Sequence, residues 1–92
     1  MTDLNEGQQF YGVVGELIVD PDTNRRRVVT MPGQAVEEGI FIECDKPVRE
    51  SHPIGTRFKV DVGVSRKPTG RIYLHSLKKH ELLTIEEYDS KY

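Results

Sequence analysis

The sequence predicts an all-β domain, a small antiparallel barrel or rolled sheet of five to six strands. Short stretches of alternating apolar and polar residues recur along the chain, and clusters of turn-forming residues separate them. The chain has 92 residues, a length that fits one domain spanning residues 1–92. No apolar stretch approaches the roughly 20 residues that a membrane-spanning helix needs, so we expect no contact with a membrane.

Composition indicates an ordinary globular protein, with 36% hydrophobic and 30% charged residues. Cys44 is the single cysteine, which excludes an internal disulfide and fits a reducing compartment. The segment Met1–Glu6 is acidic and polar, unlike the basic and apolar start of a signal peptide. We therefore expect a cytoplasmic protein, with residues 1–8 flexible.

The first predicted hairpin joins a strand over Phe10–Val19 to a returning strand over Arg25–Met31. Between them, residues 20–24 are rich in Asp, Asn and Pro, which favour turns. Gly12 and Gly15 lie inside the first strand and predict a bend or bulge. Its odd-numbered apolar residues are expected to share the inward face: Tyr11, Val13, Leu17 and Val19.

The middle of the chain predicts one short strand between two connections. Residues 34–39 form a loop or a single helical turn, and Ile40–Cys44 form a strand with Ile40, Ile42 and Cys44 on one side. The segment Asp45–Gly55 contains two prolines and lacks a helical period, so we expect a long connection without a helix.

A second hairpin is the clearest pattern in the chain. Residues 56–64 and 71–76 alternate strictly, and a turn over 66–70 contains Pro and Gly. The expected inward residues are Phe58, Val60, Val62, Val64, Ile72 and Leu74. The expected cross-strand pairs are Val64 with Ile72, Gly63 with Tyr73, Val62 with Leu74, and Asp61 with His75.

The C-terminal residues 84–92 form either a tail or a helical turn. Residues 81–85 can close the sheet as a strand, whereas Thr84 followed by Glu87 fits a capping box that opens a short helix through Tyr88. We favour a short strand around His80–Leu83 followed by a helical turn.

This layout resembles OB-fold and SH3-like barrels in size and in its many short strands. The helix that usually lies between the third and fourth OB strands has no predicted counterpart in residues 45–55. No motif assigns the chain to one family.

Charge is distributed in blocks, although the net charge is −2 and the pI of about 5.9 argues against a dedicated nucleic-acid binder. Residues 51–80 carry seven Lys and Arg against Asp61 alone, which favours a local basic face. The second hairpin and its turn are expected to present Arg57, Lys59, Arg66, Lys67, Arg71, Tyr73 and His75. Exposed aromatic rings beside cations suit single-stranded nucleic acid, because bases stack on the rings. A solvated sheet face is the plainer alternative, with Tyr73 covering the backbone of Gly63.

Catalytic, metal and cofactor sites are not predicted. His75 opposite Asp61 would form an acid–base pair, but no nucleophile is placed beside it by a motif. The spacing of His75, His80 and Cys44 does not match a zinc site. Glycines inside a strand do not form a phosphate-binding loop, and an Arg25–Arg27 triplet that alternates across a strand is expected to be a solvated edge.

The sequence thus favours a non-enzymatic binding module that recognises a protein partner, or a second copy of itself, through an exposed strand face or edge. The second hypothesis is single-stranded nucleic-acid binding by the basic and aromatic sheet face. The third is a small enzyme that uses His75 and Asp61.

Overall fold

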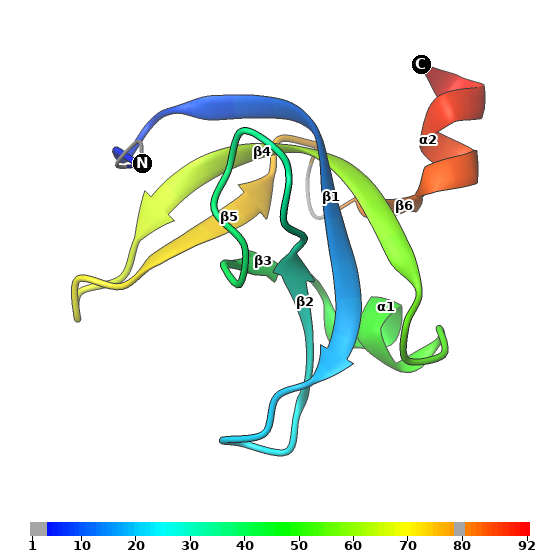
Figure 1. Ribbon diagram of the computed structural model, residues 1–92, viewed down its shortest axis with the longest axis horizontal. Coiled ribbons are helices and arrows are strands. Elements are labelled where there is room, and N and C mark those ends of the chain that lie inside the picture. The colour runs from blue at the N-terminus through cyan, green and yellow to red at the C-terminus, as the bar shows by residue number, and fades with distance from the viewer. Residues whose placement is uncertain (1–3, 79–80) are drawn as a thin grey trace.

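The computed structural model describes residues 4–78 and 81–92, and these residues form a mainly β structure, as the sequence predicts. Strands and helices follow one another as β1 (Gln9–Val19), β2 (Arg26–Thr30), β3 (Phe41–Glu43), α1 (Lys46–Glu50), β4 (Arg57–Arg66), β5 (Ile72–Ser76), β6 (Leu83–Thr84) and α2 (Ile85–Lys91). Figure 1 shows β1 and β4 as the two long, curved strands, with the β1–β2 and β4–β5 hairpins projecting in different directions.

Five strands close into a barrel. The strand order is β1-β2-β3-β5-β4, and β4 pairs back onto β1. All of these pairings are antiparallel except β3 with β5, which is parallel, so the barrel is mixed rather than wholly antiparallel as expected. The two-residue strand β6 adds to β4 outside the barrel. A helix, α1, lies between β3 and β4, the position at which OB-type barrels usually carry one.

A bulge in β1 bends the strand around the barrel. The pairing of β1 with β4 shifts between Phe10 and Val13, and Gly12 in this interval has φ +66, where glycine is favoured. The predicted bend is confirmed, but it changes which side chains face inward. Phe10 packs on the core, whereas Tyr11 is 70% exposed and Val19 at the strand end is 44% exposed, so their predicted inward placement is wrong.

The core fills the barrel interior with residues from all five strands. The largest fully buried side chains are Phe58, Leu17, Leu74, Val28, Val62 and Val64. The predicted inward faces of β4 and β5 are therefore confirmed. Residues 34–39 form a loop, also as expected.

The connection between β3 and β4 contains α1, so the prediction of a helix-free segment is wrong. Five residues are too few to produce a recognisable helical period. Pro47 is tolerated because it lies in the first turn, where its missing N–H has no partner to lose.

The register of the β4–β5 hairpin differs from the predicted one by two residues along β5. Val64 pairs with Leu74, Gly63 with His75 and Ser65 with Tyr73. The amide of Gly70 donates to the carbonyl of Lys67, and Gly70 has φ +90. The loop therefore consists of residues 68–70, with Pro68 at the second turn position. Its centre lies one residue later in the chain than expected, which moves the partner of each β4 residue by two positions along β5. The inward faces stay unchanged because the shift is even.

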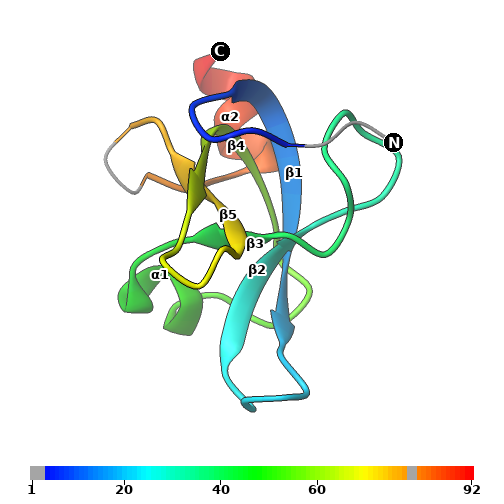
Figure 2. The same ribbon diagram turned by 90° about the vertical axis from the view of Figure 1, so that its left-hand side faces the viewer.

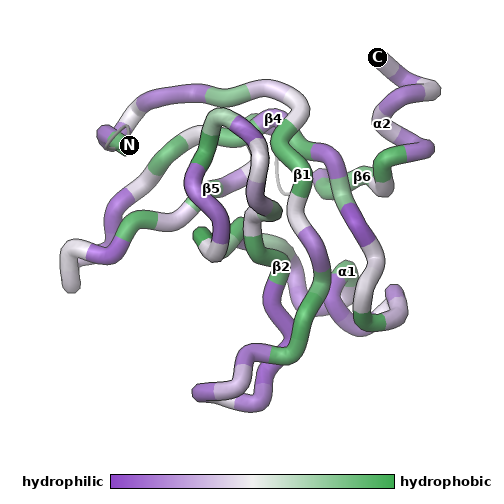
Figure 3. Tube along the Cα trace, viewed as in Figure 1, coloured by the Kyte–Doolittle hydropathy of each residue, from purple (hydrophilic) through white to green (hydrophobic). Residues whose placement is uncertain are grey.

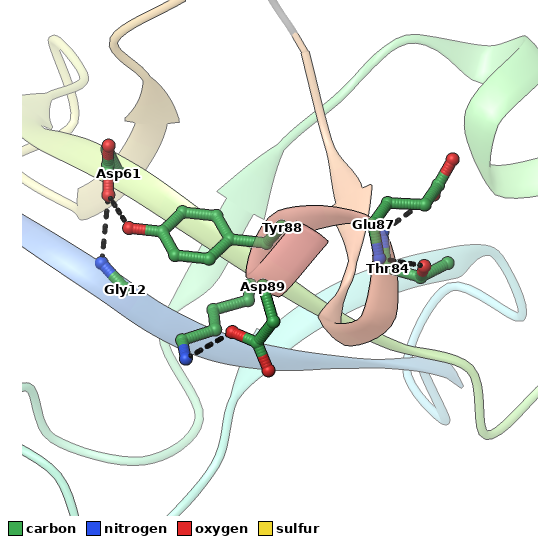
Figure 4. A network of polar contacts seen from close by, with 7 residues as sticks. Gly12, Asp61, Thr84, Glu87, Tyr88 and Asp89 are labelled. Atoms are coloured by element: carbon green, nitrogen blue, oxygen red, sulfur yellow. Dashed lines mark hydrogen bonds and ion pairs between the residues drawn. The ribbon is translucent and has the colours of Figure 1, made fainter. Parts of the chain in front are cut away.

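The predicted capping box at the C-terminus is confirmed. Thr84 Oγ1 accepts from the amide of Glu87, and Glu87 Oε1 accepts from the amide of Thr84. The strand preceding it covers Leu83–Thr84, and His80 lies outside the described residues. Figure 4 shows that the side chain of Tyr88 in α2 points toward Asp61 on β4.

Candidate nucleic-acid interface

The seven predicted binding residues separate into two groups along β4. Arg57 and Lys59 lie at the start of the strand, about 26 Å and about 20 Å from Ser65 near its end for an extended chain. Arg57 Nε pairs with Glu16 Oε1 at 3.1 Å, and Lys59 Nζ pairs with Asp89 Oδ1 at 2.9 Å. These two cations are engaged by carboxylates and do not share a surface with the β4–β5 turn.

The other five residues gather around the β4–β5 turn and the adjoining part of β5. The Nη1 of Arg66 donates to the carbonyl of Gly70 at 2.7 Å, which fixes the turn. Lys67 Nζ lies 5.3 Å from the ring centroid of Tyr73, a cation–π distance. The expected combination of a cation and an aromatic ring therefore forms at Lys67 and Tyr73, although the ring is half-buried and not fully exposed as expected.

His75 makes contacts other than those expected. Its Nδ1 lies 2.9 Å from Ser65 Oγ, and its ring covers Gly63, where an added Cβ would lie 2.9 Å from Nε2. His75 thus occupies the position predicted for Tyr73. Asp61 instead accepts hydrogen bonds from the amide of Gly12 and the hydroxyl of Tyr88. The predicted His75–Asp61 pair is wrong because the register places Gly63 opposite His75.

A second aromatic ring, which sequence reasoning missed, completes the surface. Phe41 on β3 is half-buried, and two guanidinium groups lie against its ring: Arg71 at 4.6 Å and Arg27 at 5.3 Å from the centroid. We name this surface the basic–aromatic stripe; its residues are Arg27, Phe41, Arg71, Tyr73 and Lys67. It crosses β2, β3 and β5 and ends at the β4–β5 turn.

An open pocket adjoins the stripe where β2 begins. It has a volume of about 540 Å³ and lies between the β1–β2 hairpin and α1. We name it the basic pocket; its lining residues are Asn24, Arg25, Arg26, Arg27, Lys46, Arg49 and Glu50. Arg27 belongs to both the pocket and the stripe, so the two surfaces are continuous.

The Arg25–Arg27 triplet is therefore more than an alternating edge. Arg26 Nη1 donates to the carbonyl oxygens of Arg49 at 3.3 Å and His52 at 2.9 Å, which ties the hairpin to the segment around α1. Alternation along the strand was expected to separate the arginines, but all three line the same pocket, to which α1 adds Lys46 and Arg49.

The cations of both surfaces keep their charge available. The ion pairs found within residues 4–78 and 81–92 use Arg57, Lys59 and Lys91, none of which belongs to the stripe or the pocket. Arg27 Nε is buried and has no hydrogen-bond partner in the described part of the chain. A buried guanidinium nitrogen without a partner is costly.

The carboxylate of Glu43 lies on the same face of the sheet as the stripe. Glu43 is exposed on β3, and in the strand register it lies opposite His75 of the parallel strand β5. Glu43 and Phe41 lie on the same face of β3 because side chains alternate along a strand. The negative charge of Glu43 therefore lowers the attraction of this face for anions.

Cys44 adjoins the pocket but does not form a reactive site. Burial raises the pKa of its thiol, and this effect exceeds the opposing attraction of Arg49. A thiol with a raised pKa is a poor nucleophile at neutral pH.

No family model, curated protein or solved structure matches this chain. The interface is therefore interpreted from its own geometry. Within residues 4–78 and 81–92, no group of three or more His, Cys, Asp or Glu side chains is arranged to hold a metal ion. None of the helices in those ranges is long and apolar enough to cross a membrane.

Two signals in the sequence point to the missed residues. Phe41 alternates with the inward Ile40 and Ile42, which places a large ring on the outer face of a short strand. Lys46 and Arg49 are three residues apart, a spacing that aligns them on one side of a helical turn. The second signal is readable only once α1 is known.

Proposed function

We propose that this protein binds single-stranded nucleic acid along the basic–aromatic stripe. The observation that carries the proposal is the position of two guanidinium groups, from Arg27 and Arg71, against the ring of Phe41. Bases stack on aromatic rings and on guanidinium planes alike, so this cluster offers sequence-tolerant stacking surfaces. Tyr73 with Lys67 supplies the same combination at the far end of the stripe.

The location on the barrel supports the same proposal. OB-type barrels bind oligonucleotides on the outer face of strands 2 and 3 and between the β1–β2 and β4–β5 loops. Arg27 and Phe41 of the stripe lie on β2 and β3, and both loops project from the barrel (Figure 1). The fold alone does not establish a function, and the argument depends on the cations and rings at that place.

A single strand fits better than a duplex. The bases of a duplex are already stacked on one another and leave no free face for Phe41 or Tyr73. A single strand exposes its base faces to the rings and its phosphates to the cations, here Arg27, Arg71 and Lys67.

Binding to a protein partner or to a second copy ranks below nucleic-acid binding. The expectation of self-association depended on spare strand edges and on charge blocks of opposite sign. Each barrel strand is paired on both sides, because β4 closes onto β1. Self-association stays a prediction, and the sedimentation mass at micromolar concentration tests it. A mass above that of one chain would support it, whereas a monomer would count against it.

The test is fluorescence anisotropy with short labelled DNA and RNA single strands at low ionic strength. We expect binding that weakens as salt is added, with a slope of log K against log salt of about −3 if four cations contact phosphates. Phe41→Ala and Tyr73→Ala should each weaken binding roughly tenfold, because a stacked base contributes about 1–3 kcal/mol.

Arg57→Ala is the matched control for this test. It removes a cation that pairs with Glu16 away from the stripe, so it should leave affinity nearly unchanged. Undetectable binding at low salt would refute the proposal, as would equal losses in the Arg57 and Phe41 variants. A comparison of DNA with RNA shows which strand is preferred.

A cytoplasmic location is part of the proposal. Cys44 is the single cysteine and is buried, so neither an internal nor an exposed intermolecular disulfide supports the fold. This cysteine usage fits a reducing compartment.

A further inference from the structure

We infer that the basic pocket accepts a terminal phosphate of the strand that the stripe binds, an inference that rests on the proposed function. The pocket presents five cationic side chains against the single carboxylate of Glu50. These cations come from two separate segments, with Arg25–Arg27 on the β1–β2 hairpin and Lys46 and Arg49 on α1. Such convergence indicates a ligand group with more than one negative charge.

The charge of the phosphate group decides between an internal and a terminal position. A phosphodiester inside a strand carries one negative charge. A terminal phosphate monoester carries between one and a half and two charges near neutral pH, on three strong acceptor oxygens. Guanidinium groups bind such oxygens in bidentate fashion. A monoester therefore satisfies the Arg-rich pocket better than a phosphodiester does.

The pocket is organised before any ligand arrives. The two hydrogen bonds from Arg26 to backbone carbonyls hold the hairpin and α1 together. Figures 1 and 2 both place the β1–β2 hairpin and α1 at the same end of the barrel. The volume of about 540 Å³ falls within the range of sites that hold a nucleotide-sized group.

The pocket also lies at an end of the path. Arg27 is the residue that the pocket shares with the stripe, so a strand that follows Tyr73 and Phe41 reaches the pocket at Arg27. Beyond Arg27 the lining residues are Arg25, Arg26 and those of α1, without an aromatic ring. A base has no stacking surface there, whereas a phosphate has several donors.

The experiment compares one oligonucleotide in three forms: with a 5′-phosphate, with a 3′-phosphate and with neither. Anisotropy at fixed salt should show that a phosphate at one end tightens binding about tenfold, as expected for added charge-assisted hydrogen bonds. Arg49→Gln should abolish this gain, so that the variant binds the three forms with equal affinity. Lys91→Gln, which removes a cation on α2, should retain the gain.

Circular dichroism verifies that Arg49→Gln is folded, and Lys46→Gln replaces it if it is not. Equal binding of the three oligonucleotides would overturn the inference and leave the proposed function intact. A gain that survives in both pocket variants would also overturn it.

If none of the three binds, the proposed function is wrong. Titration with a 5′-mononucleotide and with inorganic phosphate, followed by NMR, then tests separately whether the pocket binds phosphate. Shifts confined to residues 24–27 and 46–50 would support a phosphate site, whereas unchanged spectra would overturn it. The comparison of the two probes distinguishes a nucleotide from free phosphate.

Discussion

The hydroxyl of Tyr88 donates a 2.8 Å hydrogen bond to Oδ1 of Asp61 and so fixes the C-terminal helix to the barrel. The same oxygen accepts from the amide of Gly12 at 2.9 Å, inside the bulge of β1 (Figure 4). Asp61 thus joins β1, β4 and α2. The helix has no buried residue, so its attachment depends on a few polar contacts, which include Lys59 with Asp89. The tip of the β1–β2 hairpin is also hydrophilic (Figure 3).

We predict that α2 detaches at alkaline pH. The hydrogen bond to Asp61 raises the pKa of Tyr88 above its ordinary value of 10.0, because it stabilises the protonated phenol. A raised pKa means that the contribution is complete below the unfolded-state pKa and is lost as pH rises through the folded-state pKa. Helical circular dichroism should therefore fall above pH 10. Tyr88→Phe should remove this step and lower the unfolding free energy by about 1 kcal/mol. An unchanged alkaline transition in Tyr88→Phe would contradict the prediction.

We predict that Glu43→Gln strengthens nucleic-acid binding. The substitution keeps the size of the side chain and removes the negative charge beside His75 on the binding face. We expect a gain of roughly threefold at low salt, which shrinks as screening increases. Glu86→Gln on α2 changes the net charge equally and is the control. Equal gains in both variants, measured by anisotropy, would show that only the net charge matters.

We predict that Cys44 reacts slowly in the folded protein. Burial raises its pKa above the ordinary value of 9.0, which leaves almost no thiolate at neutral pH. Alkylation by iodoacetamide, followed by mass spectrometry, should be roughly a hundredfold slower in buffer than in concentrated urea. Similar rates in the two solutions would contradict the prediction and mean that the chain around Cys44, directly after β3, opens readily.

Much of the barrel can be predicted from sequence because its strands obey a period of two. The alternation over β4 and β5 places Phe58, Val62 and Leu74 inward whatever the register, since an even shift preserves the face. The register itself depends on the turn. Gly70, in the left-handed region after Pro68, defines that turn. The register predicted from the sequence places His75 opposite Asp61, whereas the structure pairs His75 with Gly63.

The binding surface was harder to predict because it combines segments that are distant in sequence. Arg27, Phe41 and Arg71 meet only because β3 lies between β2 and β5, and strand order is not encoded in any local pattern. The pocket further requires α1, whose five residues carry no readable period. Lys67 and Tyr73 were predicted together because one hairpin brings them into contact.

We predict that Gly15→Ala destabilises the barrel through two specific clashes. An added Cβ would lie 2.7 Å from Val28 Cγ1 and 2.7 Å from Ile42 Cδ1, inside the core. Overpacking of this kind costs about 1–3 kcal/mol, which exceeds the gain of roughly 0.4–1 kcal/mol from a less flexible unfolded chain. We expect a net loss of about 1–2 kcal/mol in the unfolding free energy, measured by urea titration.

The partner substitution Ile42→Val tests the cause of that loss. Valine lacks the Cδ1 atom that the new methyl group would meet, so the double variant should be more stable than the sum of the two single losses predicts. A coupling of at least about 0.5 kcal/mol would be expected for side chains in direct contact. Strictly additive losses would mean that the contact with Ile42 is not the cause, which leaves the contact with Val28 or the backbone of β1.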